Sequence, residues 1–269
     1  YLFDISMELA LKGKESLSSL KPTPLYKPKN VNLVTPCTYD NDLAKIGEVD
    51  WVLEAVVERL DIKEKVYQKL LPHLKNTALL TSNTSGIPLS DLTVSLPKEV
   101  RQRFMITHFF NPPRYMQLLE LVRGKETSEE TYNSMIEFGE SILGKGIVHA
   151  KDTPNFIGNR IGVFGMMTAV KLAIKNELSV EEVDKLTGPI SGRPKSATFR
   201  TADIVGLDTL KNVSLTTYEK AIEDEERDIF QIPNILDTLI KSNRLGQKTK
   251  AGFYKKTDDG ILSVDLKTG

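Results

Sequence analysis

The histidine best placed for chemistry in this sequence is His108, near the end of an apolar segment that begins at Phe104. Histidine is the side chain whose ordinary pKa suits proton transfer near neutral pH. Glu120 follows twelve residues later inside a second apolar segment, 116–122. A lone carboxylate there is costly to bury unless it is paired. A hydrogen bond between these two side chains would orient the imidazole, and the spacing leaves open whether the pair is catalytic or only structural.

Further polar residues follow other apolar segments. Ser82-Asn83-Thr84-Ser85-Gly86 supplies hydroxyls and an amide after a predicted strand, and its alternative interpretation is a turn rich in local hydrogen bonds. Asn159 lies early in an apolar helical segment, where it is either packed polar filler or directed to a cleft between domains. The sequence has no metal-ligand spacing, Walker loop or nucleophile elbow. Ser, Asn, His and Glu together therefore suggest acid–base chemistry on a hydroxyl or carbonyl group.

Asp4 follows Tyr1-Leu2-Phe3, which is typical of the end of a strand. In dinucleotide-binding βαβ units an acidic residue at a strand end binds the adenosine ribose hydroxyls. The alternative is that Asp4 caps a helix beginning at Ser6. Because the chain starts on a strand-like segment with no initiator Met, we expect it to be a piece of a longer polypeptide.

The elements that would position these residues alternate between strands and helices in the first half. Strands are predicted at 32–39, 51–57, 78–82, 104–109, 116–122 and 146–150, and helices at 61–74 and 127–143. Near-continuous apolar runs such as 51–57 are typical of strands buried on both faces of a parallel sheet. The helix 61–74 carries an apolar stripe at spacing four, namely Ile62, Val66, Leu70 and Leu74. This alternation predicts an open α/β sheet, which binds ligands at the carboxyl ends of its strands.

The second half has helical patterns and almost no strand signals. Helices are predicted at 156–176, 179–186, 209–222 and 232–242, and a strand-like segment, 261–266, ends the chain. Thr153-Pro154 marks the boundary, with Thr153 or Asn155 as the expected helix cap. We therefore predict an α/β domain at 1–151 and an all-α domain at 152–269.

Composition excludes several function classes. Lys plus Arg and Asp plus Glu are equal at 36 each, which argues against broad electrostatic binding to nucleic acid. The single cysteine, Cys37, excludes an intrachain disulfide framework and a cysteine-rich zinc site. No apolar run approaches the roughly 20 residues of a membrane helix, so we expect no membrane span.

Several motifs together resemble the L-3-hydroxyacyl-CoA dehydrogenase family of fatty-acid β-oxidation, over nearly the whole chain and in order. They are Glu54-Ala55-Val56-Val57-Glu58-Arg59-Leu60, Ser82-Asn83-Thr84-Ser85, His108-Phe109-Phe110-Asn111-Pro112, Asp152-Thr153-Pro154, Asn159-Arg160, Val205-Gly206-Leu207-Asp208-Thr209, Leu245-Gly246-Gln247-Lys248 and Gly252-Phe253-Tyr254. The resemblance implies a Rossmann-type NAD-binding domain followed by an all-α substrate-binding and dimerisation domain. It also implies NAD-dependent oxidation of L-3-hydroxyacyl-CoA to 3-oxoacyl-CoA.

The family's roles transfer to the matching residues. The resemblance implies that His108 is the general base and Glu120 its orienting carboxylate. Ser85 and Asn159 would hold the substrate oxygens, and Asn111 would support His108.

The resemblance also implies a set of cofactor-binding residues. Asp4 would bind the NAD ribose, and its carboxylate would disfavour the 2′-phosphate of NADP. Residues expected near the nicotinamide half are Glu58, Lys63 and Asn83.

The resemblance further implies partners and a location. The stretch 192–200 is similar to that of long bacterial multifunctional β-oxidation proteins, in which an enoyl-CoA hydratase-like domain is fused to this module. We therefore expect an acyl-CoA substrate, a fused or associated hydratase domain, a homodimer and a bacterial cytoplasmic location.

One departure from the family concerns the cofactor. The first strand and the Gly-x-Gly-x-x-Gly turn have no counterpart, since the only Gly-x-Gly, at Gly144 and Gly146, follows a predicted helix. We expect two neighbouring strands to lack a central partner as a result.

The alternative function is therefore a non-catalytic acyl-CoA-binding or structural fragment. A β-hydroxyacid dehydrogenase with a lysine base is disfavoured by His108 and Glu120.

Overall fold

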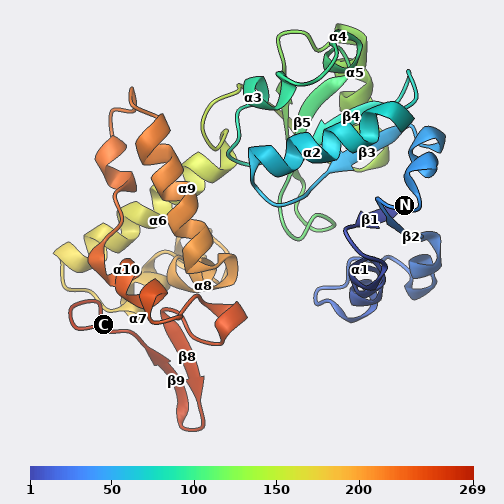
Figure 1. Ribbon diagram of the computed structural model, residues 1–269. Helices are drawn as coiled ribbons and strands as arrows, with labels where there is room; N and C mark the ends of the chain where they lie inside the picture. Colours follow the sequence, from blue (N-terminus) through green and yellow to red (C-terminus); the bar gives the residue numbers. More distant parts are fainter. The chain divides into compact units, whose positions relative to one another are not determined.

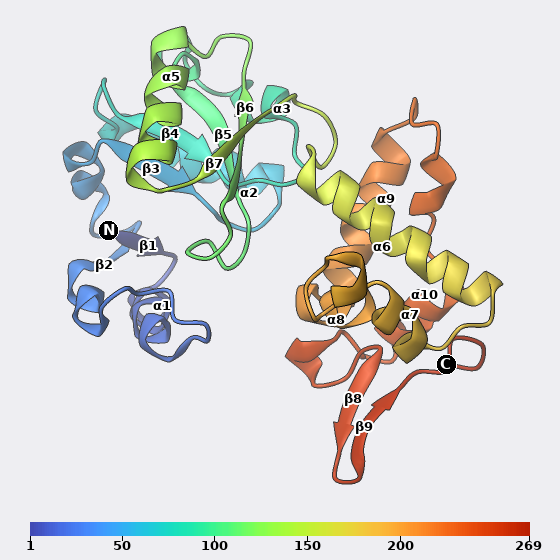
Figure 2. The same cartoon turned by 180° about the vertical axis from the view of Figure 1, so that it is seen from behind.

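The structure, a computed structural model, describes all residues from 1 to 269. The chain forms two compact units, Tyr1–Asp152 and Thr153–Gly269, which Figures 1 and 2 show from opposite sides. The first unit is the α/β part and the second is mainly helical. Each unit has its own cluster of buried apolar side chains. No helix has the combination of length and apolar character that a membrane crossing needs.

The larger sheet of the first unit has five strands in the order β3-β4-β5-β6-β7. Their bounds are β3 Trp51–Glu54, β4 Leu79–Ser82, β5 Phe104–Phe109, β6 Leu118–Arg123 and β7 Gly146–Ala150. Neighbouring strands are parallel except β5 and β6, which pair antiparallel. The connection 110–117 is shorter than the crossover of about a dozen residues that a parallel pair requires. The sheet is therefore mixed, where the sequence predicts a parallel one.

Helices cover both faces of this sheet. They are α2 Leu60–Leu70, the short α3 Leu89–Thr93 and α4 Lys98–Arg101, and α5 Glu129–Glu137, which continues as a π turn over Phe138–Ile142. Figures 1 and 2 show α2 and α5 on opposite faces. The buried face of α2 carries Lys63 and Tyr67 beside Leu70 of the predicted apolar stripe, whereas Ile62 and Val66 of that stripe are only half-buried. Lys63 is buried because two carboxylates receive its ammonium group, which an apolar-periodicity argument cannot detect.

A second, two-stranded sheet in the first unit pairs β1 Leu2–Asp4 in parallel with β2 Pro36–Thr38. The helix α1, Met7–Ser19, connects them, and the predicted strand 32–39 is shorter because Pro28–Leu33 forms a 3₁₀ helix. Ser6 caps α1 by accepting the Leu9 N–H, so the interpretation of Asp4 as that cap is wrong. β1 pairs only with β2, and β3 only with β4, which agrees with the expectation that two strands lack a central neighbour.

The second unit contains five α-helices and a β-hairpin. They are α6 Gly158–Lys175, α7 Val180–Leu186, α8 Phe199–Val205, α9 Leu207–Lys220, α10 Asn234–Lys241, β8 Tyr254–Thr257 and β9 Gly260–Ser263. The expected helical domain is confirmed, and β9 of this hairpin overlaps the strand-like segment predicted at 261–266. Asp258 and Asp259 form the short turn before Gly260. Thr153 and Asn155 do not cap α6, because Ile157 is its N-cap. The Asn155 amide instead donates to Val213 O and Thr217 Oγ1.

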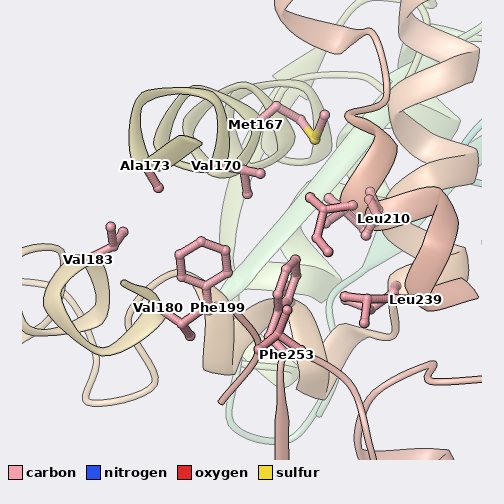
Figure 3. Close-up of a cluster of buried hydrophobic side chains, with 14 of the residues drawn as sticks. Met167, Val170, Ala173, Val180, Val183, Phe199, Leu210, Leu239 and Phe253 are labelled. Atoms are coloured by element: carbon pink, nitrogen blue, oxygen red, sulfur yellow. The ribbon is translucent and has the colours of Figure 1, made fainter. Parts of the chain in front are cut away.

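Apolar packing holds the second unit together. Figure 3 shows Met167 and Val170 of α6 facing side chains from the other helices and from Phe253. The rings of Phe199 and Phe253 meet edge to face with centroids 4.6 Å apart. Asp203 accepts the backbone N–H groups of Phe253 and Tyr254, which fixes the chain beside this core.

Candidate active site

The centre of the candidate site is a buried pair at the antiparallel junction of β5 and β6. His108 and Glu120 are opposite each other in the strand register, and His108 Nδ1 lies 2.7 Å from Glu120 Oε2. The Glu120 side chain is completely buried, and His108 is nearly so. The Phe110 ring packs against the imidazole, with centroids 4.6 Å apart. When His108 is neutral and donates from Nδ1 to the carboxylate, its Nε2 is left as the basic nitrogen.

The loop that follows β4 is held by a carboxylate from a neighbouring connection. Glu58 Oε1 accepts three hydrogen bonds, from Thr84 Oγ1 at 2.5 Å, Ser85 N at 3.0 Å and Gly86 N at 2.9 Å. Burial by itself raises the pKa of the Glu58 carboxyl, but these hydrogen bonds and the Lys63 charge outweigh it and lower that pKa. Glu58 therefore fixes the backbone on either side of Ser85 as an ionised acceptor.

Asn83 connects this loop to the strand that carries His108. Its backbone N–H donates to Glu54 O at 2.8 Å, and its side-chain Oδ1 accepts the Phe109 N–H at 2.9 Å. Phe109 directly follows His108. Since β4 and β5 are parallel neighbours, the Ser85 loop and His108 lie at the same edge of the sheet.

A buried polar cluster lies beneath the loop, and the sequence reasoning gave its central residue, Glu54, no role. Glu54 Oε1 accepts the Lys63 Nζ at 2.8 Å and the Val56 N–H at 2.7 Å. Its Oε2 accepts the Tyr67 hydroxyl at 2.9 Å and the Ser82 hydroxyl at 2.6 Å. Burial, together with the Glu54 charge, raises the pKa of Tyr67. The signal was available, because Glu54 is a lone carboxylate in an apolar strand just as Glu120 is.

Six of the predicted site residues lie together in the first unit, at this edge of the five-stranded sheet. They are His108, Glu120, Ser85, Asn83, Glu58 and Lys63. Three others lie elsewhere. Asp4 ends β1 in the two-stranded sheet, Asn111 is exposed in the connection 110–117, and Asn159 is half-buried at the beginning of α6 in the second unit.

The residues expected to bind NAD divide by their exposure. Asp4 is part-exposed at a strand end and accepts one hydrogen bond, from Ile5 N to Oδ1. Glu58 has 42 % of its side chain exposed. These carboxylates fit the hydroxyl and amide donors of a nicotinamide dinucleotide. Lys63 is different, because its side chain is 1 % exposed and its ammonium faces Glu54 and Glu58.

Sequence comparisons match both units to one family. The family model described as "3-hydroxyacyl-CoA dehydrogenase, NAD binding domain" matches residues 1–153, and "3-hydroxyacyl-CoA dehydrogenase, C-terminal domain" matches residues 156–256. The chain is 42% identical over 262 residues to a "Probable 3-hydroxyacyl-CoA dehydrogenase" of Bacillus subtilis, covering 97% of this chain and 33% of the relative. It thus spans about a third of that protein's length.

Two further relatives and one solved structure are also similar to this chain. A "Probable 3-hydroxyacyl-CoA dehydrogenase" of Deinococcus radiodurans is 39% identical, covering 93% of this chain and 72% of the relative. A "Putative fatty acid oxidation complex trifunctional enzyme" of Rickettsia felis is 38% identical, covering 90% of this chain and 34% of the relative. The crystal structure of M. tuberculosis FadB2 superposes with a TM-score of 0.83 at 28% identity, covering 95% of this chain and 89% of that one.

Proposed function

Since the chain belongs to the 3-hydroxyacyl-CoA dehydrogenase family, we propose that this protein oxidises the 3-hydroxyl group of L-3-hydroxyacyl-CoA, giving 3-oxoacyl-CoA and NADH. The observation that carries the proposal is the buried His108–Glu120 pair at the carboxyl end of β5. NAD, when bound, supplies the hydride acceptor for this reaction.

The geometry of the pair supports a general-base role. Glu120 Oε2 receives the Nδ1–H of neutral His108, which leaves Nε2 to take the proton of the substrate hydroxyl. The imidazolium that forms is then stabilised by the buried carboxylate 2.7 Å away. The substrate hydroxyl loses its proton to His108, and bound NAD would accept the hydride from the carbon that bears this oxygen, so a ketone would remain.

Ser85, Asn159 and Asn111 complete the proposed substrate contacts. We propose that the Ser85 hydroxyl binds the reacting oxygen, because Glu58 holds the Ser85 and Gly86 backbone at the sheet edge that carries His108. The roles of Asn159 with the substrate oxygens and of Asn111 with His108 stay predictions. Asp4, Glu58, Lys63 and Asn83 likewise stay the predicted NAD residues.

The test is turnover of 3-hydroxybutyryl-CoA, followed by the absorbance of NADH. His108→Gln should lower kcat by about 10² to 10⁴-fold, the usual contribution of a general base. His149→Gln is the matched control, since His149 lies at the end of β7 and contacts Tyr132 instead of the site. Wild-type rates in His108→Gln would overturn the assignment of the base.

The alternative is a non-catalytic acyl-CoA-binding or structural module. One observation favours it, because β1 and β3 are each paired along one edge only. Titration with NAD separates the two functions. Saturable NAD binding by the chain excludes the alternative, whereas acyl-CoA binding without NAD binding supports it.

We also propose a homodimer, an enoyl-CoA hydratase-like domain as a fused or associated partner, and a bacterial cytoplasmic location. The trifunctional name of the Rickettsia relative supports the fused partner, and the bacterial relatives support the location.

Exposed apolar side chains along α6, at Ile157, Ile161, Phe164 and Leu172, support a contact surface for a second copy. Sedimentation at several concentrations tests the dimer, and a monomer throughout would exclude it. Competition by free CoA tests the acyl-CoA substrate.

A further inference from the structure

A continuous line of contacts runs from buried side chains at the sheet to the half-exposed Ser85 loop. It begins at Glu54 Oε1, which accepts Lys63 Nζ at 2.8 Å. The same ammonium lies 3.3 Å from Glu58 Oε2. The other oxygen of Glu58 receives the Ser85 and Gly86 N–H groups. Glu54 also holds the strand before the loop, because its Oε2 receives the Ser82 hydroxyl.

The charges in this line constrain each other. Lys63 has 1 % and Glu54 0 % of its side chain exposed, so each needs the other as a counter-charge. An ammonium has three donors, and here they are shared by Glu54, Glu58 and the Val56 carbonyl. If Glu54 lost its charge, the Lys63 ammonium would keep only Glu58 as an ionic partner. The attraction of the Lys63 ammonium would then draw the Glu58 carboxylate away from the loop amides.

We propose that Glu54 is a positioning residue for the dehydrogenase reaction, acting through Lys63 and Glu58 to set the place of Ser85. This inference rests on the proposed function, in which Ser85 binds the reacting oxygen. Glu54 touches neither substrate nor cofactor, since its side chain is fully buried and all four of its hydrogen bonds go to protein groups. It is thus a counterpart of Glu120, one carboxylate setting the loop and the other the base.

The experiment compares three variants, Glu54→Gln, Lys63→Met and the double variant. The readouts are kcat and KM, the Tm, and hydrogen exchange of the Ser85 and Gly86 amides by NMR. Glu54→Gln keeps the side-chain shape and should speed exchange at these two amides by about tenfold or more. It should lower kcat by about tenfold, with the KM for acyl-CoA changed by less than about threefold. Thr127→Val is the matched control, as a buried hydroxyl of the same unit outside this line.

The double variant tests whether the released Lys63 ammonium is what displaces the loop. Removing both charges of a buried pair often restores stability that either single change loses. We therefore expect its Tm to rise above that of Lys63→Met, and the Ser85 and Gly86 amides to regain protection, because no ammonium is left to draw Glu58 away. Amides that stay as unprotected as in Glu54→Gln would overturn the proposal, and so would normal protection in Glu54→Gln. If the wild type binds NAD and acyl-CoA but shows no turnover, the proposed function fails, and the exchange measurements alone then decide the role of Glu54.

Discussion

The two units use buried carboxylates for different purposes. In the first unit, Glu120 and Glu54 accept hydrogen bonds from ionisable side chains at the edge of the sheet. In the second, the buried Asp203 accepts two backbone N–H groups beside an apolar core. A carboxylate paired with movable side chains can tune a reactive group, whereas one that receives backbone donors fixes the course of the chain. In this chain the buried carboxylates at the candidate site have ionisable partners, whereas Asp203 beside the core of the second unit has backbone partners.

Replacing the orienting carboxylate gives the largest expected effect. Glu120→Gln should reduce kcat by up to about 10⁴-fold, because the amide neither fixes the productive imidazole tautomer nor stabilises the imidazolium. Turnover at saturating substrate measures it, with the Tm as the accompanying control for folding. A variant that keeps more than a tenth of wild-type kcat would contradict the proposed role of the buried carboxylates of the first unit.

Truncating the apolar core tests the second unit. Phe253→Ala removes a fully buried ring that contacts Phe199, and should lower the free energy of unfolding by about 3 to 5 kcal/mol. Denaturant unfolding followed by circular dichroism measures this loss. If the substitution affects only packing in this core, the slope of the free energy of unfolding against denaturant concentration should stay near the wild-type value. A loss below about 1 kcal/mol would show that the core repacks easily.

Asp203 and Glu58 should make the stability of their units depend on pH with opposite sign. Burial raises the pKa of Asp203 in spite of its backbone hydrogen bonds, so its ionisation opposes folding and stability falls as pH rises from 3.8 through the raised value. Glu58 has a lowered pKa, so its contribution is present above 4.5 and is lost as pH falls through the lowered value. The free energy of unfolding measured against pH should show this. Relative to wild type, Asp203→Asn should gain stability as pH rises, whereas Glu58→Gln should lose stability as pH rises. Changes of the same sign would break the contrast.

The smallest effect concerns a helix end in the second unit. Ser179 and Glu182 form a capping box at the beginning of α7, each side chain accepting the other residue's backbone N–H. Ser179→Ala should cost about 1 kcal/mol of stability. A thermal melt measures it, and kcat at a temperature well below the Tm should stay at the wild-type value.

The sequence predicts most of the elements that carry the site, because they depend on local pattern. The bounds expected for β5 and β7 agree with the structure, and the argument that pairs Glu120 with His108 is confirmed by their contact. The family and the Rossmann-type fold follow from motifs spread over nearly the whole chain, and the comparisons confirm both.

The parts that were missed depend on partners distant in the chain. Glu54 accepts a hydrogen bond from Ser82, 28 residues away, and its ion pair with Lys63 explains why α2 buries a lysine beside its apolar residues. Asn155 forgoes capping α6 because Val213 and Thr217, about sixty residues on, offer acceptors for its amide. Periodicity and capping rules rank local choices and contain no term for such tertiary partners.

The reversal of direction between β5 and β6 has a consequence for the order of assembly. It brings His108 and Glu120 together across a hairpin, so the contact spans only twelve residues. The contacts that hold the Ser85 loop span 26 to 28 residues and require parallel strands to meet first. Closing a shorter loop costs less chain entropy. During folding we therefore expect the His108–Glu120 pair to form before the Ser85 loop is in place.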